Sequence, residues 1–144
     1  MYNYTKLSKR IKKNEGFKNY IYYDQLGYKT IGYGHLIRNS DKFRLNKKYS
    51  KKILTNTFNN DLKKAIINFR KNYNYKLPPN VQEVIIEMIF QLGIRGLLKF
   101  KKFNLHIKKK QYYLAALEML KSRWYNQTPK RVSGLIKILL KNAT

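Results

Sequence analysis

The sequence predicts an α+β fold that is mainly α-helical, with a small antiparallel sheet near the N-terminus and a larger helical part after it. Residues 17–34 are rich in Tyr and Ile and are interrupted by Gly27, Gly32 and Gly34, which is typical of short strands joined by tight turns. After residue 50, apolar residues recur at helical spacing. A chain of 144 residues with 43% hydrophobic content can fill one main core, so we expect a single domain over residues 1–144.

The first half of the chain predicts two helices and a loop around the sheet. A short helix is expected over residues 5–14, capped by Thr5 and ended by Gly16. Residues 38–50 are polar and basic and favour a loop. A long helix is expected over residues 50–70.

The second half predicts a series of helices. Pro78 and Pro79 break the chain, and Asn80 is positioned to cap an apolar central helix that runs to Leu92. Shorter amphipathic helices are expected near residues 100–107 and 112–120, and Thr128-Pro129 is typical of the start of a last helix. The single tryptophan, Trp124, is interpreted as a core anchor.

The charge balance points to an anionic partner. The chain carries 32 Lys and Arg against seven Asp and Glu, a formal charge of +25. Charge alone does not choose among nucleic acid, a membrane and an acidic polymer. The absence of cysteine excludes disulfides and thiolate metal sites, and with only two histidines we expect neither a metal site nor a cofactor.

The sequence also bears on location. It has no apolar run of about 18 residues that would span a bilayer, and its first residues lack the apolar region of a secretory signal. We therefore expect synthesis in a host cytoplasm without a signal peptide, and action on any outer target only after a membrane lesion or external application.

Two of the seven carboxylates, Glu15 and Asp24, lie on either side of the turn from the first helix into the hairpin. A carboxyl that donates a proton and a second that stays ionised are what hydrolysis of a glycosidic bond requires. Thr30, on the returning strand, offers a hydroxyl to hold a water. Spacing alone also fits an ordinary helix-end glutamate and a turn-forming aspartate, so it leaves both interpretations open.

The whole string resembles a known catalytic segment. Glu15, Asp24 and Thr30, followed by Ile-Gly-Tyr-Gly-His-Leu, are similar to the active-site segment of the T-even phage lysozymes, glycoside hydrolase family 24. The resemblance returns in residues 88–93, Met-Ile-Phe-Gln-Leu-Gly, and in residues 121–131 around Trp124. The three matches occur in the family's order and cover most of the chain.

The resemblance implies a two-lobed lysozyme-like fold. The small sheet lobe would cover about residues 14–58, the connecting helix residues 50–70, and the larger helical lobe residues 71–144 together with helix 5–14. It also implies a peptidoglycan-degrading N-acetylmuramidase that cuts the β-1,4 bond between N-acetylmuramic acid and N-acetylglucosamine and lyses bacteria. Inversion at the anomeric carbon would need a carboxyl separation of roughly 6.5 to 9.5 Å.

The resemblance also assigns roles to single residues. Glu15 would be the general acid and Asp24 the general base, and Thr30 would help hold the water. His35 and Asp61 would form a structural ion pair, and Arg131 would pair with the catalytic glutamate. Four residues match the family's sugar contacts: Leu36, Phe90, Phe103 and Glu118. Of these, Phe103 and Glu118 stand where the family has small or amide polar groups, and Glu87 replaces a neutral amide with a carboxylate whose partner the sequence does not reveal.

The expected partner is therefore bacterial peptidoglycan, bound by a monomer. The charge also predicts incidental binding to other anionic polymers or membranes, whereas no motif for specific nucleic-acid recognition is present. One alternative is a catalytically weak, cationic wall- or membrane-binding protein on a lysozyme fold. The basic amphipathic last helix, from residue 129, could in that case disturb anionic bilayers, although packing is the preferred interpretation.

Overall fold

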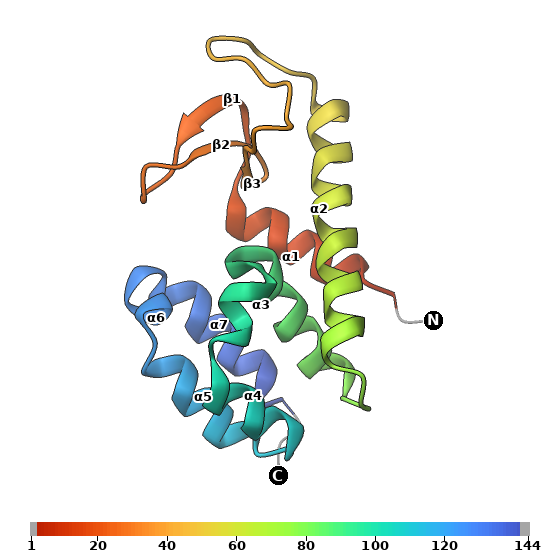
Figure 1. Ribbon diagram of the computed structural model, residues 1–144, viewed down its shortest axis with the longest axis vertical. Helices are drawn as coiled ribbons and strands as arrows, with labels where there is room; N and C mark the ends of the chain where they lie inside the picture. The colour runs from red at the N-terminus through yellow and green to blue at the C-terminus, as the bar shows by residue number, and fades with distance from the viewer. Residues whose placement is uncertain (1–2, 142–144) are drawn as a thin grey trace. The chain divides into compact units, whose positions relative to one another are not determined.

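The computed structural model describes residues 3–141, which form seven α-helices and one three-stranded sheet (Figure 1). The predicted mainly helical α+β fold is therefore confirmed. The elements follow in the order α1 Thr5–Glu15, β1 Lys18–Tyr23, β2 Lys29–Gly32, β3 His35–Leu36, α2 Lys51–Asn72, α3 Pro79–Leu98, α4 Lys101–Lys108, α5 Tyr112–Leu120, α6 Arg123–Gln127 and α7 Pro129–Leu139.

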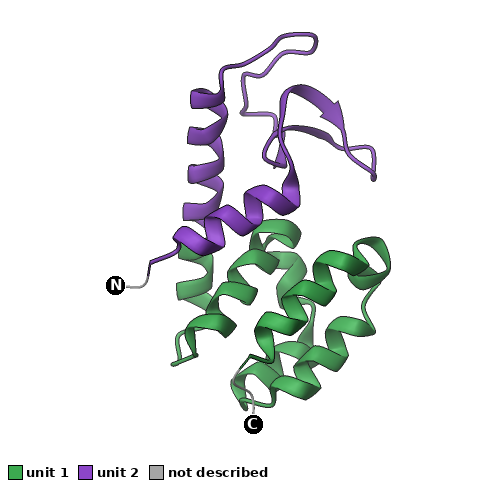
Figure 2. Ribbon diagram, turned by 180° about the vertical axis from the view of Figure 1, so that it is seen from behind, with its two compact units in different colours: residues 1–2, 65–144 green, residues 3–64 purple. Residues whose placement is uncertain are grey.

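The described chain divides into two compact units, residues 3–64 and residues 65–141, which Figure 2 shows in purple and green. The division falls within α2, which confirms the long helix expected over residues 50–70. The sequence analysis had grouped helix 5–14 with the larger lobe, and that grouping stays a prediction.

The first unit contains the sheet, in the order β1-β2-β3 with antiparallel neighbours. Tyr22 of β1 lies opposite Thr30 of β2, and Thr30 lies opposite Leu36 of β3. The segment between β3 and α2 has no helix or strand, as the polar composition predicted. It is tied to the sheet because the backbone N–H of Tyr49 donates to the carbonyl of Asn19 over 2.8 Å.

The prediction that Thr5 caps α1 is wrong. Thr5 is the first helical residue, and its backbone N–H donates to Asn3 Oδ1 over 2.8 Å. The side chain of Asn3 thus accepts from the N–H of Thr5. A capping side chain at Thr5 would instead have accepted from an N–H group two or three residues later. The prediction that Gly16 ends the helix is confirmed: its φ is 71°, and its N–H donates to the carbonyl of Lys12.

The second unit is built around α3, whose residues from Val84 to Ile89 are buried. The prediction that Asn80 caps this helix is wrong, because the helix begins at Pro79. The side-chain amide of Asn80 donates instead to the carbonyls of Ile138 and Lys141, over 2.9 and 3.1 Å. It therefore adds a donor to carbonyls at the C-terminal end of α7, where the regular helical hydrogen bonds run out.

The remaining helices agree with the patterns. The helices expected near residues 100–107 and 112–120 are α4 and α5, and α7 begins at Pro129 after Thr128, as predicted. Trp124 is 4% exposed, which confirms a buried position. The apolar side chains Val132, Leu135 and Leu139 of α7 are buried too, so packing is the use of that face. Among residues 3–141, no helix has the length and apolar character needed to cross a bilayer.

Candidate active site

Glu15, the last residue of α1, lies directly against Gly34 in the turn between β2 and β3. A Cβ atom on Gly34 would be 2.6 Å from Glu15 Oε1 and 3.1 Å from Cγ, and Gly34 has a φ of +75°. Only glycine adopts this backbone conformation at little cost while leaving room for the carboxyl. The Tyr-Gly-His string therefore places Glu15 as well as forming the turn.

Asp24 occupies the turn between β1 and β2 and is held by backbone donors. Its Oδ1 accepts hydrogen bonds from the N–H groups of Leu26 and Tyr28, over 2.9 and 2.8 Å. Its own N–H donates to the carbonyl of Tyr28 over 2.9 Å. Both side-chain bonds use Oδ1, so the carboxylate is fixed in orientation while Oδ2 is the oxygen available to bind a water.

Thr30 is tied to the same peptide segment. Its hydroxyl, in a side chain only 4% exposed, donates to the carbonyl of Tyr28 over 3.0 Å. The backbone of Tyr28 thus connects Asp24 to Thr30 through its N–H on one side and its carbonyl on the other. Since the hydroxyl hydrogen is used in this bond, the oxygen of Thr30 acts as an acceptor toward a water.

Tyr22 of β1 is influenced by the charges of both predicted catalytic carboxyl groups. Burial raises the pKa of Tyr22 above its ordinary value of 10.0, and the negative charges of Glu15 and then Asp24 raise it further. The charges of both carboxylates therefore act on this phenol. Tyr22 is also opposite Thr30 in the sheet. Tyr22, which the sequence did not single out, thus pairs with Thr30 in the sheet and is influenced by the charges of Glu15 and Asp24.

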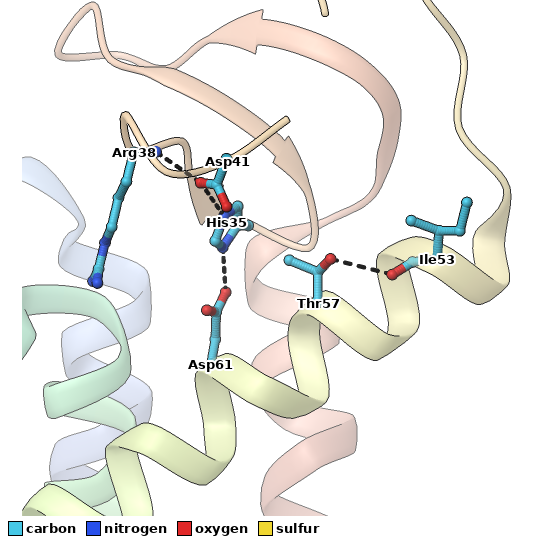
Figure 3. Close-up of polar contacts among 6 residues, drawn as sticks. All are labelled: His35, Arg38, Asp41, Ile53, Thr57 and Asp61. Carbon is cyan, nitrogen blue, oxygen red and sulfur yellow. Dashed lines mark hydrogen bonds and ion pairs between the residues drawn. The ribbon is translucent and has the colours of Figure 1, made fainter. Parts of the chain in front are cut away.

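His35 lies between two carboxylates (Figure 3). Its Nδ1 is 2.7 Å from Asp61 Oδ2, the residue with which the resemblance paired it, and its Nε2 is 2.9 Å from Asp41 Oδ2. Asp41 also accepts from the backbone N–H of Arg38 over 2.7 Å. Asp41 was not predicted, because an aspartate in a polar loop six residues after a histidine carries no signal of its own. The three side chains join the loop, β3 and α2, and we call them the His35 cluster.

The His35 cluster favours charged forms of its members. Burial by itself lowers the pKa of His35, but the hydrogen bonds and charges of Asp61 and Asp41 outweigh burial and raise that pKa above 6.5. Burial likewise raises the pKa of Asp41, but the N–H of Arg38 and the His35 ring outweigh it and hold that pKa below 3.8. With a carboxylate at each ring nitrogen, His35 binds best as an imidazolium that donates from both.

The four predicted sugar contacts are found in different settings. Phe103, 1% exposed, and Glu118 line a cavity of about 540 Å³ in the second unit, together with Phe100 and Trp124. Glu118 Oε1 lies 3.9 Å from Lys121 Nζ. Leu36 is 47% exposed on β3, and Phe90 is half-buried on α3. Their contacts with sugar stay a prediction.

Glu87 has a partner that the sequence did not reveal. It is fully buried in α3, and Arg131 Nε donates to its Oε2 over 3.1 Å. A buried carboxylate without such a cation would be strongly unfavourable, so the replacement of a neutral amide here depends on Arg131. The predicted pairing of Arg131 with Glu15 stays a prediction.

Comparisons with known proteins agree with this architecture. The family model described as Phage lysozyme matches residues 12–138. The chain is 34% identical to Probable T4-type lysozyme 1 of Dictyostelium discoideum and 32% identical to Probable T4-type lysozyme 2; these alignments cover 90% and 93% of both proteins. It is also 27% identical to part of the pre-baseplate central spike protein Gp5 of Enterobacteria phage T4, over 93% of this chain and 27% of Gp5.

Proposed function

Because this chain belongs to the phage lysozyme family, we propose that it hydrolyses the β-1,4 bond between N-acetylmuramic acid and N-acetylglucosamine in peptidoglycan and thereby lyses bacteria. The observation that carries the proposal is that Glu15 lies against the turn between β2 and β3, while Asp24 and Thr30 both bind the peptide of Tyr28 in the same unit. Two carboxyl groups and a hydroxyl at one site are sufficient for acid/base hydrolysis of a glycoside, without a cofactor.

Each group has a role that follows from its contacts. Glu15, held against Gly34, donates its proton to the glycosidic oxygen as the bond breaks. Asp24 removes a proton from a water through Oδ2, and the acceptor oxygen of Thr30 orients that water toward the anomeric carbon. Attack from the face opposite the leaving group inverts the configuration, so a β-linked substrate first yields the α-anomer.

The charge supports an anionic wall as the substrate. A formal charge of +25 attracts the acidic stems of peptidoglycan and speeds encounter with them, and added salt weakens the attraction. The same field attracts other anionic polymers. A monomer suffices for this mechanism, since all three catalytic groups come from residues 3–64 of one chain.

The test compares Glu15→Gln with the parent on purified peptidoglycan, by counting new reducing ends. Removing the general acid is expected to lower the rate by about 100-fold or more. Glu83→Gln changes the net charge identically and is expected to retain the activity. Proton NMR of the first product tests inversion, and circular dichroism checks folding.

The cationic-binder alternative gives a different result in the same experiment. If folded Glu15→Gln and the parent clear wall suspensions equally, and neither releases reducing ends, the protein acts by charge and the proposed hydrolysis is wrong. If reducing ends appear with the β-anomer first, the hydrolysis stands but the inverting mechanism does not.

A further inference from the structure

Helix α5 exposes four large apolar side chains. Its outward residues are Tyr113, Leu114, Leu117 and Leu120, exposed by 61%, 45%, 46% and 44%. Its buried residues are Ala115, Ala116 and Met119. Four large apolar residues on the outer face depart from the usual pattern, in which a surface helix turns its apolar residues toward the core.

The exposed residues form one continuous stripe. Tyr113, Leu117 and Leu120 are spaced four and three residues apart, which places them on the same helical face, and Leu114 lies beside them. We call these four residues the α5 stripe. Single exposed leucines are ordinary on protein surfaces, but a contiguous apolar patch on a chain this polar indicates an interaction surface.

Cations lie at both ends of the stripe. Lys108, Lys109 and Lys110 are exposed immediately before α5, and Lys121 and Arg123 are exposed immediately after it. Figure 1 shows α5 joined to α4 by this short lysine-rich turn. Glu118 is the one carboxylate between residues 98 and 123, and it lies 3.9 Å from Lys121 Nζ. The surface is thus apolar along its middle and positive at its ends.

We propose that the α5 stripe binds the surface of an anionic phospholipid bilayer. A helix that lies in the plane of such a membrane places its apolar face among the upper acyl chains, while lysines at its ends extend to the phosphates. A bilayer offers an apolar layer and negative charge together, without requiring a matching shape. A second copy of this chain would instead bring two sets of cations together, which charge repulsion opposes.

The proposal is tested with variants that leave the net charge unchanged, because a charge of +25 alone attracts anionic vesicles. The full chain is sedimented with vesicles of pure phosphatidylcholine and with vesicles of equal parts phosphatidylcholine and phosphatidylglycerol. The double variant Leu114→Ser, Leu117→Ser removes half of the stripe. The matched control, Leu45→Ser with Ile53→Ser, removes two side chains that are similarly exposed, by 50% and 48%, elsewhere on the chain.

The parent and the control are expected to bind the anionic vesicles alike, and the stripe variant at least about tenfold more weakly. At high salt, which screens the lysines, the difference is expected to widen because apolar contact then supplies most of the binding. A Tyr113→Trp variant places a fluorescent side chain in the stripe, and brominated acyl chains are expected to quench its emission. The emission of the buried Trp124, measured in the parent, is subtracted as background.

Three results would overturn the proposal. The parent could fail to sediment with anionic vesicles, or the stripe variant could bind as tightly as its control, which would assign the binding to charge alone. Sedimentation equilibrium without lipid gives the third: a parent that dimerises and a stripe variant that does not would assign the stripe to self-association. Because these readouts use vesicles and no peptidoglycan, they are independent of the hydrolytic activity.

Discussion

Replacing Gly34 with alanine should displace the Glu15 carboxyl while leaving the fold largely intact. The new Cβ would lie 2.6 Å from Glu15 Oε1, and an ordinary van der Waals contact begins at 3.4 Å. The oxygen must therefore withdraw by about 0.8 Å. Because Oε1 is the end of a flexible side chain, the movement itself costs little stability.

The stability and the activity should respond differently. The φ of +75° at Gly34 makes any L-residue there unfavourable by about 1–2 kcal/mol. A misplacement of nearly 1 Å in a reacting group costs up to about 100-fold in rate. The Gly34→Ala variant is thus expected to remain folded at room temperature but to release reducing ends from peptidoglycan about 100-fold more slowly.

Gly93→Ala is the matched control. Gly93 has a φ of +77°, and a Cβ there would meet nothing within 4 Å, so this variant also carries a positive-φ backbone cost but moves no carboxyl. Urea denaturation should show a loss of stability for both variants, and only Gly34→Ala should lose activity. Equal activity in both would refute the argument that Glu15 must occupy this position to act.

Three further predictions follow from the polar contacts. The His35 cluster should stabilise the fold most between about pH 3.8 and 6.5. The contribution of His35 to the free energy of unfolding is lost as pH rises through its raised pKa, and the contribution of Asp41 is lost as pH falls through its lowered pKa. Asp41→Asn should reduce stability by about 1 kcal/mol near pH 6 and flatten the alkaline decline in denaturation midpoints; an unchanged pH profile would contradict this. Arg131→Met should cost about 3–5 kcal/mol by removing the cation that donates to the buried Glu87, and Glu87→Met in the same chain should recover most of that loss in urea denaturation; a double variant no more stable than the single one would refute that account. Asn80→Ala should cost about 1–2 kcal/mol by thermal denaturation, because the carbonyls of Ile138 and Lys141 each lose a hydrogen bond from its amide; Asn74→Ala, at an exposed position, should change stability little, and a similar loss there would argue against a role for the Asn80 hydrogen bonds.

The repeating pattern of apolar residues predicted the helices well. The hydrogen bonds at the helix ends were not predictable in the same way, because several groups compete for each donor and acceptor. The spacing of apolar residues located α2, α4 and α5, and Thr128-Pro129 located the start of α7. The expected caps at Thr5 and Asn80 were wrong for different reasons. The backbone N–H of Thr5 donates to the side chain of Asn3, and this local hydrogen bond competes with capping by Thr5. The side-chain amide of Asn80 donates to a carbonyl of α7 nearly 60 residues away, a contact that no local sequence pattern indicates.

The candidate site shows the same division. The residues that carry chemistry could be chosen from the string that contains Glu15, Asp24 and Thr30. Their supports could not, because a backbone group such as the peptide of Tyr28 has no signature in the sequence, and the contact of Gly34 with Glu15 depends on the angle of a turn. The partnership of Asp41 with His35 also required the path of the intervening loop.

The few carboxylates of this chain explain how such a basic protein retains a specific site. Four lie in the first unit, two in the candidate active site and two beside His35. In the second unit, Glu87 binds Arg131 and Glu118 lies near Lys121. These six therefore have local roles, and with only seven carboxylates against 32 basic side chains, most of the positive charge is not balanced by acidic groups of the chain. Repulsion among those cations opposes folding. An anionic surface that binds the folded chain offsets that repulsion, and so the wall and the bilayer proposed here should both raise the stability of the protein that they bind.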